Sequence, residues 1–169
     1  DADGNTVYTW TLNDGLKWND GEPVTADDYV FAYLVAGSPQ LVAAGASDST
    51  GENFVDYAAY HTGETDVLGG VKKIDDMTFS VTVSKDRLPY FWELSFMRVY
   101  PYPMHTLAPD ATIESTDEGS KLVGDLAEAV NKFATDHRFA PTVSCGPYSF
   151  ISFENKQVKL VKNDNFAGT

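Results

Sequence analysis

The sequence holds a single cysteine in 169 residues, Cys145, so no disulfide can form within the chain. It has no run of about 18 to 20 apolar residues, the length that a helix needs to cross a bilayer. Basic residues are also scarce, because 12 lysines and arginines stand against 25 acidic residues and give a net charge of −13. Such a charge repels a phosphate backbone, so we expect no nucleic-acid partner.

A signal peptide, a basic leader and an initiating Met are missing as well, so we expect that the natural N-terminus has been removed or lies upstream. No internal repeat or low-complexity linker divides the sequence. A chain of this size buries roughly 70% of its unfolded surface and forms one core. We therefore expect residues 1–169 to form a single domain.

Alternating apolar residues predict strands in three places. The segment "VYTWTL" at 7–12 is the first. A hairpin is expected at 71–83, with Phe79, Val81 and Val83 on its buried face. A second hairpin is expected from "YSFISF" to "QVKLVKN", with its turn at Glu154-Asn155-Lys156.

Helix signals are interspersed with these strands. Thr25, followed by Asp28, predicts a capped helix that ends at Gly37-Ser38-Pro39. The segment 41–70 is interpreted as a loop with a short helix near 53–61. Apolar residues spaced by four, four and three predict another helix within 119–138. The pattern indicates an α+β fold with a mixed or antiparallel sheet and flanking helices.

Chemistry-bearing residues do not gather into a recognisable site. His61, His105 and His137 have no second ligand at metal-binding spacing, so we predict no metal site and no cofactor. Cys145 and His137 are the one possible nucleophile and base. Cys145 has neither a neighbouring cation nor a helix start to activate it, so we predict a structural corner residue and no catalytic group.

An aromatic cluster gives the alternative function. It consists of Tyr90, Phe91, Trp92, Phe96, Tyr100 and Tyr102. A buried core layer is the favoured interpretation of these rings, and an exposed platform that stacks on sugars is the other. The second interpretation would make the chain a small carbohydrate-binding module.

Three segments, in this order, resemble one known family. The first is "YTWTLNDGLKWNDGEPVTADDYVFAY", which contains the motif residues Asp20, Gly21, Pro23, Thr25 and Asp28. The second is "GGVKKIDDMTFSVTVSKDRLPYFWEL", and the third is "VSCGPYSFISFENKQVKLVKNDNF", with Gly146, Pro147 and Tyr148. Together they resemble the extracellular solute-binding proteins of family 5, the oligopeptide- and dipeptide-binding components of ABC transporters.

The resemblance implies a two-lobed, type II periplasmic-binding-protein-like parent, of which this chain is a subdomain of the first lobe. It implies a monomer outside the cytoplasm, periplasmic or lipid-anchored, that captures peptides or similar small solutes and delivers them to a membrane permease without covalent chemistry. Cys145 takes the place of a common Thr, and Ser144 replaces a Gly. Ser144, Cys145 and Gly146 are the candidate ligand contacts, whereas the loop at 38–50 offers no aromatic residue.

Overall fold

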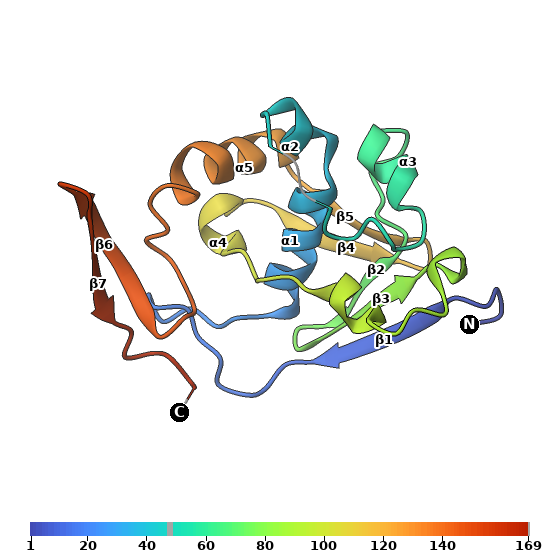
Figure 1. Ribbon diagram of the computed structural model, residues 1–169, viewed down its shortest axis with the longest axis horizontal. Coiled ribbons are helices and arrows are strands. Elements are labelled where there is room, and N and C mark those ends of the chain that lie inside the picture. Colours follow the sequence, from blue (N-terminus) through green and yellow to red (C-terminus); the bar gives the residue numbers. More distant parts are fainter. Residues whose placement is uncertain (47–48, 169) are drawn as a thin grey trace.

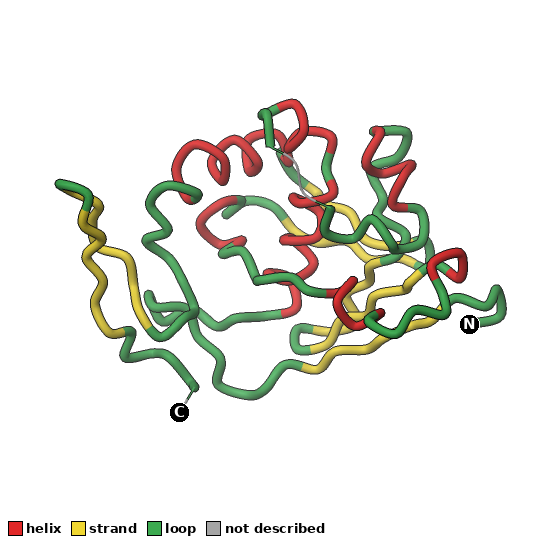
Figure 2. The backbone as a smooth tube through the Cα atoms, viewed as in Figure 1, coloured by secondary structure: helices red, strands yellow, loops and turns green. Residues whose placement is uncertain are grey.

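The computed structural model describes residues 1–46 and 49–168, and its described strands pair only in antiparallel fashion (Figures 1 and 2). The strands are β1 (Thr6–Thr11), β2 (Val71–Asp75), β3 (Thr78–Val83), β4 (Thr112–Thr116), β5 (Gly119–Val123), β6 (Tyr148–Glu154) and β7 (Gln157–Lys162). The α-helices are α1 (Ala26–Gly37), α2 (Pro39–Ala43), α3 (Tyr57–Thr62), α4 (Met104–Leu107) and α5 (Leu126–Lys132). Two 3-10 turns, η1 (Lys85–Arg87) and η2 (Glu93–Met97), and a π-helical turn, η3 (Phe133–His137), complete them. The predicted α+β class is confirmed.

The three-stranded sheet has the order β1-β3-β2, so the first strand of the chain pairs with the end of the 71–83 hairpin. Trp10 lies opposite Phe79 in this register. The predicted buried face of β3 is confirmed, because Phe79, Val81 and Val83 are at most 3% exposed. These side chains pack against α1, where the Tyr29 ring stacks on Phe79 with centroids 5.3 Å apart.

Helix α1 runs through the middle of the molecule (Figure 1). It starts after Thr25 and ends at Ser38, as predicted, and all residues from Val30 to Gly37 are buried. Its two sides belong to two apolar clusters, one with the three-stranded sheet and one with α2, α4 and α5. A helix that is apolar on all sides is stable only inside a core. Among the described residues, no helix has the length and apolar character needed to span a membrane.

The helix predicted across 119–138 is wrong in its first part. Residues 119–123 form β5, which pairs with β4, and α5 starts only after its N-cap, Asp125. The spacing of four and three fits a helix, but Gly119 and Gly124 have φ values of +141° and +154°. A Cβ at Gly119 would collide with the Leu68 carbonyl. The chain therefore turns back as a hairpin here before it becomes helical.

The segment 41–70 was expected to be a loop with one short helix near 53–61. Its helix, α3, starts at Tyr57, later than expected, and α2 reaches into the segment from its other end. Ser38 separates α1 from α2, and its side-chain oxygen accepts the Leu41 N–H at 3.2 Å. Within the 38–50 loop, residues 47–48 lie outside the described part of the chain.

The aromatic segment at 90–100 does not form the buried layer that was expected. Phe91 is 86% exposed and Trp92 65%, and Tyr90 and Tyr100 are exposed as well. Only Phe96 and Tyr102 pack partly into the core clusters. Short 3-10 structure and nearby prolines hold this segment on the surface, where its rings find no covering element among the described residues.

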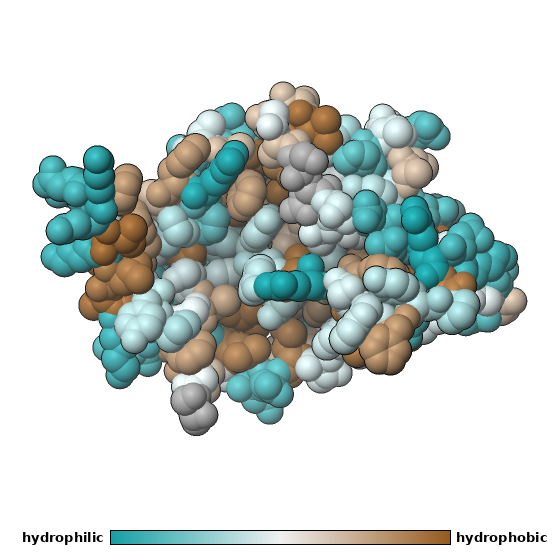
Figure 3. Space-filling model, viewed as in Figure 1, coloured by the Kyte–Doolittle hydropathy of each residue, from teal (hydrophilic) through white to brown (hydrophobic). Residues whose placement is uncertain are grey.

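The predicted hairpin of β6 and β7 is present and projects from the body of the molecule (Figure 1). Asn155 and Lys156 at its tip have φ values of 53° and 64°, which matches a tight turn with two left-handed residues. Every residue of β7 is exposed. Figure 3 shows hydrophobic side chains on this hairpin and hydrophilic ones at its tip.

Candidate functional site

Two loop motifs meet in space, the turn at 17–23 and the corner at 144–148, and Asn19 joins them. Its backbone N–H donates to the Ser144 carbonyl at 2.9 Å, and its Oδ1 accepts the Ser144 N–H at 3.0 Å. Its side-chain amide donates to the Thr142 carbonyl at 2.8 Å and to the Ser149 hydroxyl at 3.0 Å. Asn19 therefore fixes the corner against the turn through its side chain and its backbone N–H.

Two further asparagines hold the corner from its other side. The Asn163 side chain donates to the Gly146 carbonyl at 2.8 Å, and its backbone N–H donates to the Pro147 carbonyl at 2.9 Å. The Asn165 side chain donates to the Asn19 carbonyl at 3.0 Å. Asn163 is 4% exposed, so its hydrogen bonds lie inside the fold. The sequence did not predict that these asparagines are structural. Both lie in the third family-like segment, but that position alone does not indicate which groups their side chains bind.

The turn at 17–23 is itself a closed loop. The Trp18 N–H donates to the Glu22 carbonyl at 2.8 Å, and Gly21 takes a φ of +98°, a conformation that favours glycine. Asp20 reaches away from the turn to His105, with Oδ2 and Nε2 2.9 Å apart. Burial alone would raise the pKa of Asp20, but hydrogen bonds from His105 and from the Glu22 N–H outweigh burial and lower it.

Asp28 is a buried carboxylate at the start of α1, and no cation pairs with it in the described part of the chain. It accepts the Thr25 N–H at 2.9 Å, the Trp18 indole N–H at 3.3 Å and the Met104 N–H at 3.1 Å. Burial raises the pKa of Asp28, and these three donors oppose that rise. The Asp28 carboxylate thus links the turn at 17–23, the start of α1 and the start of α4 by hydrogen bonds.

Cys145 lies half-buried in the corner. Burial raises the pKa of the Cys145 thiol, and the charge of Asp28 adds to that rise, so the neutral thiol is favoured. His137 packs its ring against Phe133, and burial lowers the pKa of His137. No hydrogen bond joins Cys145 to His137 among the described residues. The arrangement offers neither a thiolate nor a base positioned beside it.

The three candidate ligand contacts follow one another in the corner, and each of them is partly exposed. Ser144 and Gly146 already use backbone groups to bond Asn19 and Asn163. A Cβ built on Gly146 would meet no atom within 4 Å, and its φ is not left-handed. The fold of this chain therefore does not require glycine at 146, and the corner stays open to an approaching molecule.

The remaining motif residues lie around the same junction. Pro23 bridges to Lys17 across the turn, and Pro147 and Tyr148 lead from the corner into β6, where Tyr148 is 61% exposed. Within the part that the structure describes, no group of three or more His, Cys, Asp or Glu side chains could hold a metal ion. The junction is thus a rigid, hydrogen-bonded support with an open corner.

Comparisons with known proteins identify a family. The model of the bacterial extracellular solute-binding proteins, family 5 Middle, matches residues 1–169. The oligopeptide-binding protein OppA of Bacillus subtilis is 35% identical, over 97% of this chain and 26% of its own length. The dipeptide-binding protein of Lactococcus lactis subsp. cremoris is 33% identical, over 95% of this chain and 26% of its own length.

A solved structure shows the same fold. Lactococcal OppA, complexed with an endogenous peptide in the closed conformation, aligns with a TM-score of 0.65 and 20% identity, over 98% of this chain and 30% of that chain. The chain spans about a quarter of the length of the Bacillus and Lactococcus relatives described above. No comparison supports the carbohydrate-binding alternative.

Proposed function

Because the chain belongs to the bacterial extracellular solute-binding proteins of family 5, we propose that it forms part of a protein that captures peptides outside the cytoplasm and delivers them to an ABC transporter permease. The observation that carries this proposal is the match over residues 1–169, together with relatives named for peptide binding. The parent protein is periplasmic or anchored by lipid at the outer face of the cell membrane.

Residues 1–169 serve as one subdomain of the first lobe of a longer, two-lobed protein. The β6–β7 hairpin supports this proposal, because a two-stranded hairpin with exposed apolar side chains is marginal in water on its own. Further strands of the parent would cover Phe153, Val158 and Leu160, which are all more than half exposed. The chain covers 26% of the length of the two relatives, which agrees with its being one part of a longer protein.

The corner at Ser144, Cys145 and Gly146 is where this subdomain approaches the ligand. Its support is the open space at Gly146 and the rigid network of asparagines behind it. A preformed surface of this kind binds without a cost in reordering. Gly146→Leu in the parent should weaken peptide binding while Tm stays unchanged, whereas unchanged affinity would remove the corner from the ligand site.

Capture here involves no covalent chemistry, no cofactor and no nucleic acid. The raised pKa of Cys145 keeps the thiol neutral, and the net charge of −13 opposes nucleic acid. The parent acts as a monomer that closes its two lobes around the ligand and opens at the permease.

The test is calorimetry on the longer protein that contains this chain, titrated with peptides of two to five residues. We expect saturable binding at micromolar Kd or tighter, equivalent to about 8 kcal/mol. Free amino acids and oligosaccharides serve as the comparison ligands. Saturable binding of those ligands with no response to any peptide would overturn the proposal.

A further inference from the structure

An apolar groove opens on the face that carries the aromatic segment. Its volume is about 290 Å³. Its floor is buried, with Phe79 at 3% and Met97 at 5% exposure, while Trp10 and Leu94 stand at its rim at 41% and 63%. Figure 3 shows hydrophobic side chains gathered below the centre of this face. Tyr29, Arg98 and Val99 also belong to the lining of the groove.

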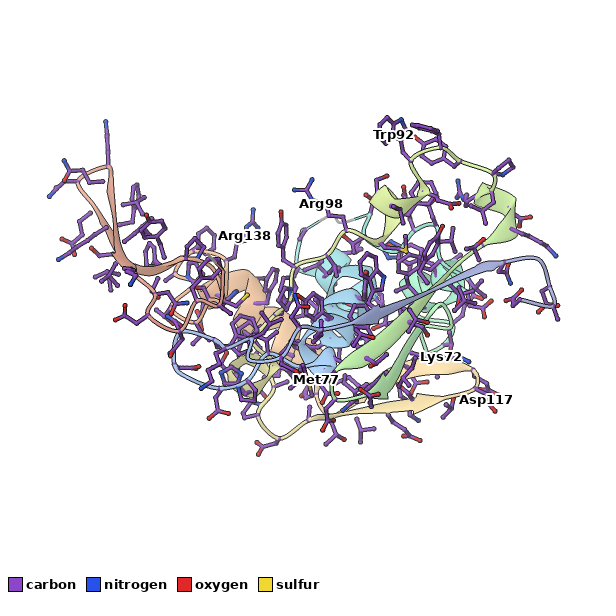
Figure 4. The ribbon with its side chains drawn as sticks, turned by 90° about the horizontal axis from the view of Figure 1, so that it is seen from below. Lys72, Met77, Trp92, Arg98, Asp117 and Arg138 are labelled. Carbon is purple, nitrogen blue, oxygen red and sulfur yellow. The ribbon has the colours of Figure 1, made fainter. Side chains whose placement is uncertain are left out.

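Arg98 supplies the one charge of this lining. Its guanidinium lies over the Tyr100 ring, 5.7 Å from the centroid, and donates to the Tyr100 hydroxyl at 2.8 Å. Figure 4 shows Arg98 and Trp92 pointing outward on the same side of the molecule. Tyr100 occupies little of the guanidinium, which has five N–H donors.

No carboxylate pairs with Arg98 in the described part of the chain. Every ion pair found there uses a lysine or a histidine. This is notable in a chain with 25 acidic and 12 basic residues. Glu93, the acidic residue in the adjoining η2 turn, accepts a hydrogen bond from the Tyr8 hydroxyl instead. Arg98 thus remains free to bind an external anion.

We infer that this groove binds a small amphipathic carboxylate, with an aromatic or branched apolar group in the groove and the carboxylate on Arg98. The volume lies near the lower end of the range for ligand pockets, which suits a single ring or side chain. A guanidinium matches a carboxylate with two parallel hydrogen bonds. The strong negative charge of the chain disfavours ligands of higher negative charge.

This inference does not rest on the proposed capture of peptides, because no residue of the corner at 144–148 belongs to the groove lining. The same ligand chemistry occurs in a free aromatic acid and at the C-terminal residue of a peptide. The probes are therefore 3-phenylpropionate for the first source and the tripeptide Ala-Ala-Phe for the second. The neutral 3-phenylpropanamide keeps the ring and removes the charge.

The experiment is titration of the 169-residue chain by calorimetry and by ligand-observed NMR. We expect saturable binding of 3-phenylpropionate and about ten-fold weaker binding of the amide, a factor equivalent to about 1.4 kcal/mol. Arg98→Gln should weaken binding of the acid by the same factor. Arg138→Gln is the matched control, because the Arg138 guanidinium lies over Phe139 at 5.6 Å in a similar way but outside the groove lining.

A second pair of variants tests the rim without touching the core. Leu94→Glu should abolish binding by placing a like charge beside the ligand, whereas Leu94→Gln should retain it. Tighter binding of Ala-Ala-Phe than of the free acid would assign the groove to peptide C-termini, and the reverse would assign it to free acids. Absence of saturable binding, equal affinity for acid and amide, or equal loss in Arg98→Gln and Arg138→Gln would overturn the site.

Discussion

At the scale of single residues, buried polar groups decide how the two loop motifs are placed. Asp28 and Asn19 satisfy N–H groups that would otherwise be buried without partners. An unsatisfied buried donor costs about 1–3 kcal/mol, which is a large part of the stability of a domain. These two side chains therefore matter more for this junction than Cys145, the residue that is most conspicuous in the sequence.

Asp28→Asn should lower the free energy of unfolding by about 2 kcal/mol, because an amide has one acceptor atom where the carboxylate serves three donors. The effect should depend on pH. Burial raises the pKa of Asp28, so the folded chain holds this proton more tightly than the unfolded chain, whose pKa is about 3.9. Its contribution is then greatest below about pH 3.9 and declines as pH rises through the raised pKa.

Urea denaturation of the wild type and Asp28→Asn between pH 3 and pH 7 measures this dependence. The stability difference between the two proteins should narrow as pH rises. A difference that widens instead would mean that the three N–H donors outweigh burial.

Asn19→Ala should release the corner without unfolding the sheet, because it removes the three side-chain hydrogen bonds that Asn19 makes with Thr142, Ser144 and Ser149. Amide hydrogen exchange is the measurement. Exchange should accelerate over 144–149 and stay slow in β3. Acceleration throughout the chain would show that Asn19 supports the whole fold, and no acceleration would show that other contacts hold the corner.

At the scale of elements, local patterns predict those parts of the fold whose partners are close in sequence. Phe79, Val81 and Val83 reveal a buried strand face by alternation, and Thr25 with Asp28 marks the start of α1. The β4–β5 hairpin was not predicted, because the apolar residues of β5 continue at helical spacing into α5. The positive φ of Gly119 and Gly124 is what interrupts that spacing, and composition alone does not reveal it.

The candidate junction could be predicted only as two separate motifs. Nothing local to Asn19 indicates that its partners lie at Thr142, Ser144 and Ser149. The prediction that the aromatic segment is buried was wrong for a related reason. Residues such as Phe91 and Trp92 are usually buried, and whether an element covers them depends on the whole chain.

Phe79→Ala should destabilise the fold by about 3–5 kcal/mol, because the ring is 3% exposed and stacks on Tyr29. Ile74→Ala is the matched control in the neighbouring strand, since Ile74 is 57% exposed. It should change stability by less than about 0.5 kcal/mol. Thermal and urea unfolding of both variants would check which face of β3 is buried. Equal losses of stability in the two variants would contradict the buried position of Phe79.

At the scale of the whole molecule, the chain has a well-formed core and an uncovered periphery. Two apolar clusters surround α1, and most of the core residues in them are fully buried. The β6–β7 hairpin lies outside these clusters, and the aromatic segment reaches them through Met97 and Phe96 while Phe91 and Trp92 stay exposed. Large exposed apolar patches mark interaction surfaces, which agrees with the proposal that this chain is one subdomain of a longer protein.

The 169-residue chain should accordingly fold alone but fail to bind the peptides that the longer parent binds. A ligand in a two-lobed protein gains affinity from being enclosed on both sides, and one subdomain supplies only part of that enclosing surface. The net charge of −13 attracts cationic peptides, but salt screens exposed charges over about 8 Å at physiological ionic strength.

Calorimetry of the chain with such a peptide, amidated at its C-terminus so that it offers no carboxylate to Arg98, should therefore show no saturable heat below about 1 mM, a Kd equivalent to roughly 4 kcal/mol. Circular dichroism with a cooperative thermal transition provides the control that the chain is folded. Any weak association should disappear as the salt concentration rises, because screened charge is its source. Micromolar binding that persists at high salt would place the complete peptide site within these residues and would contradict the proposed division between the lobes.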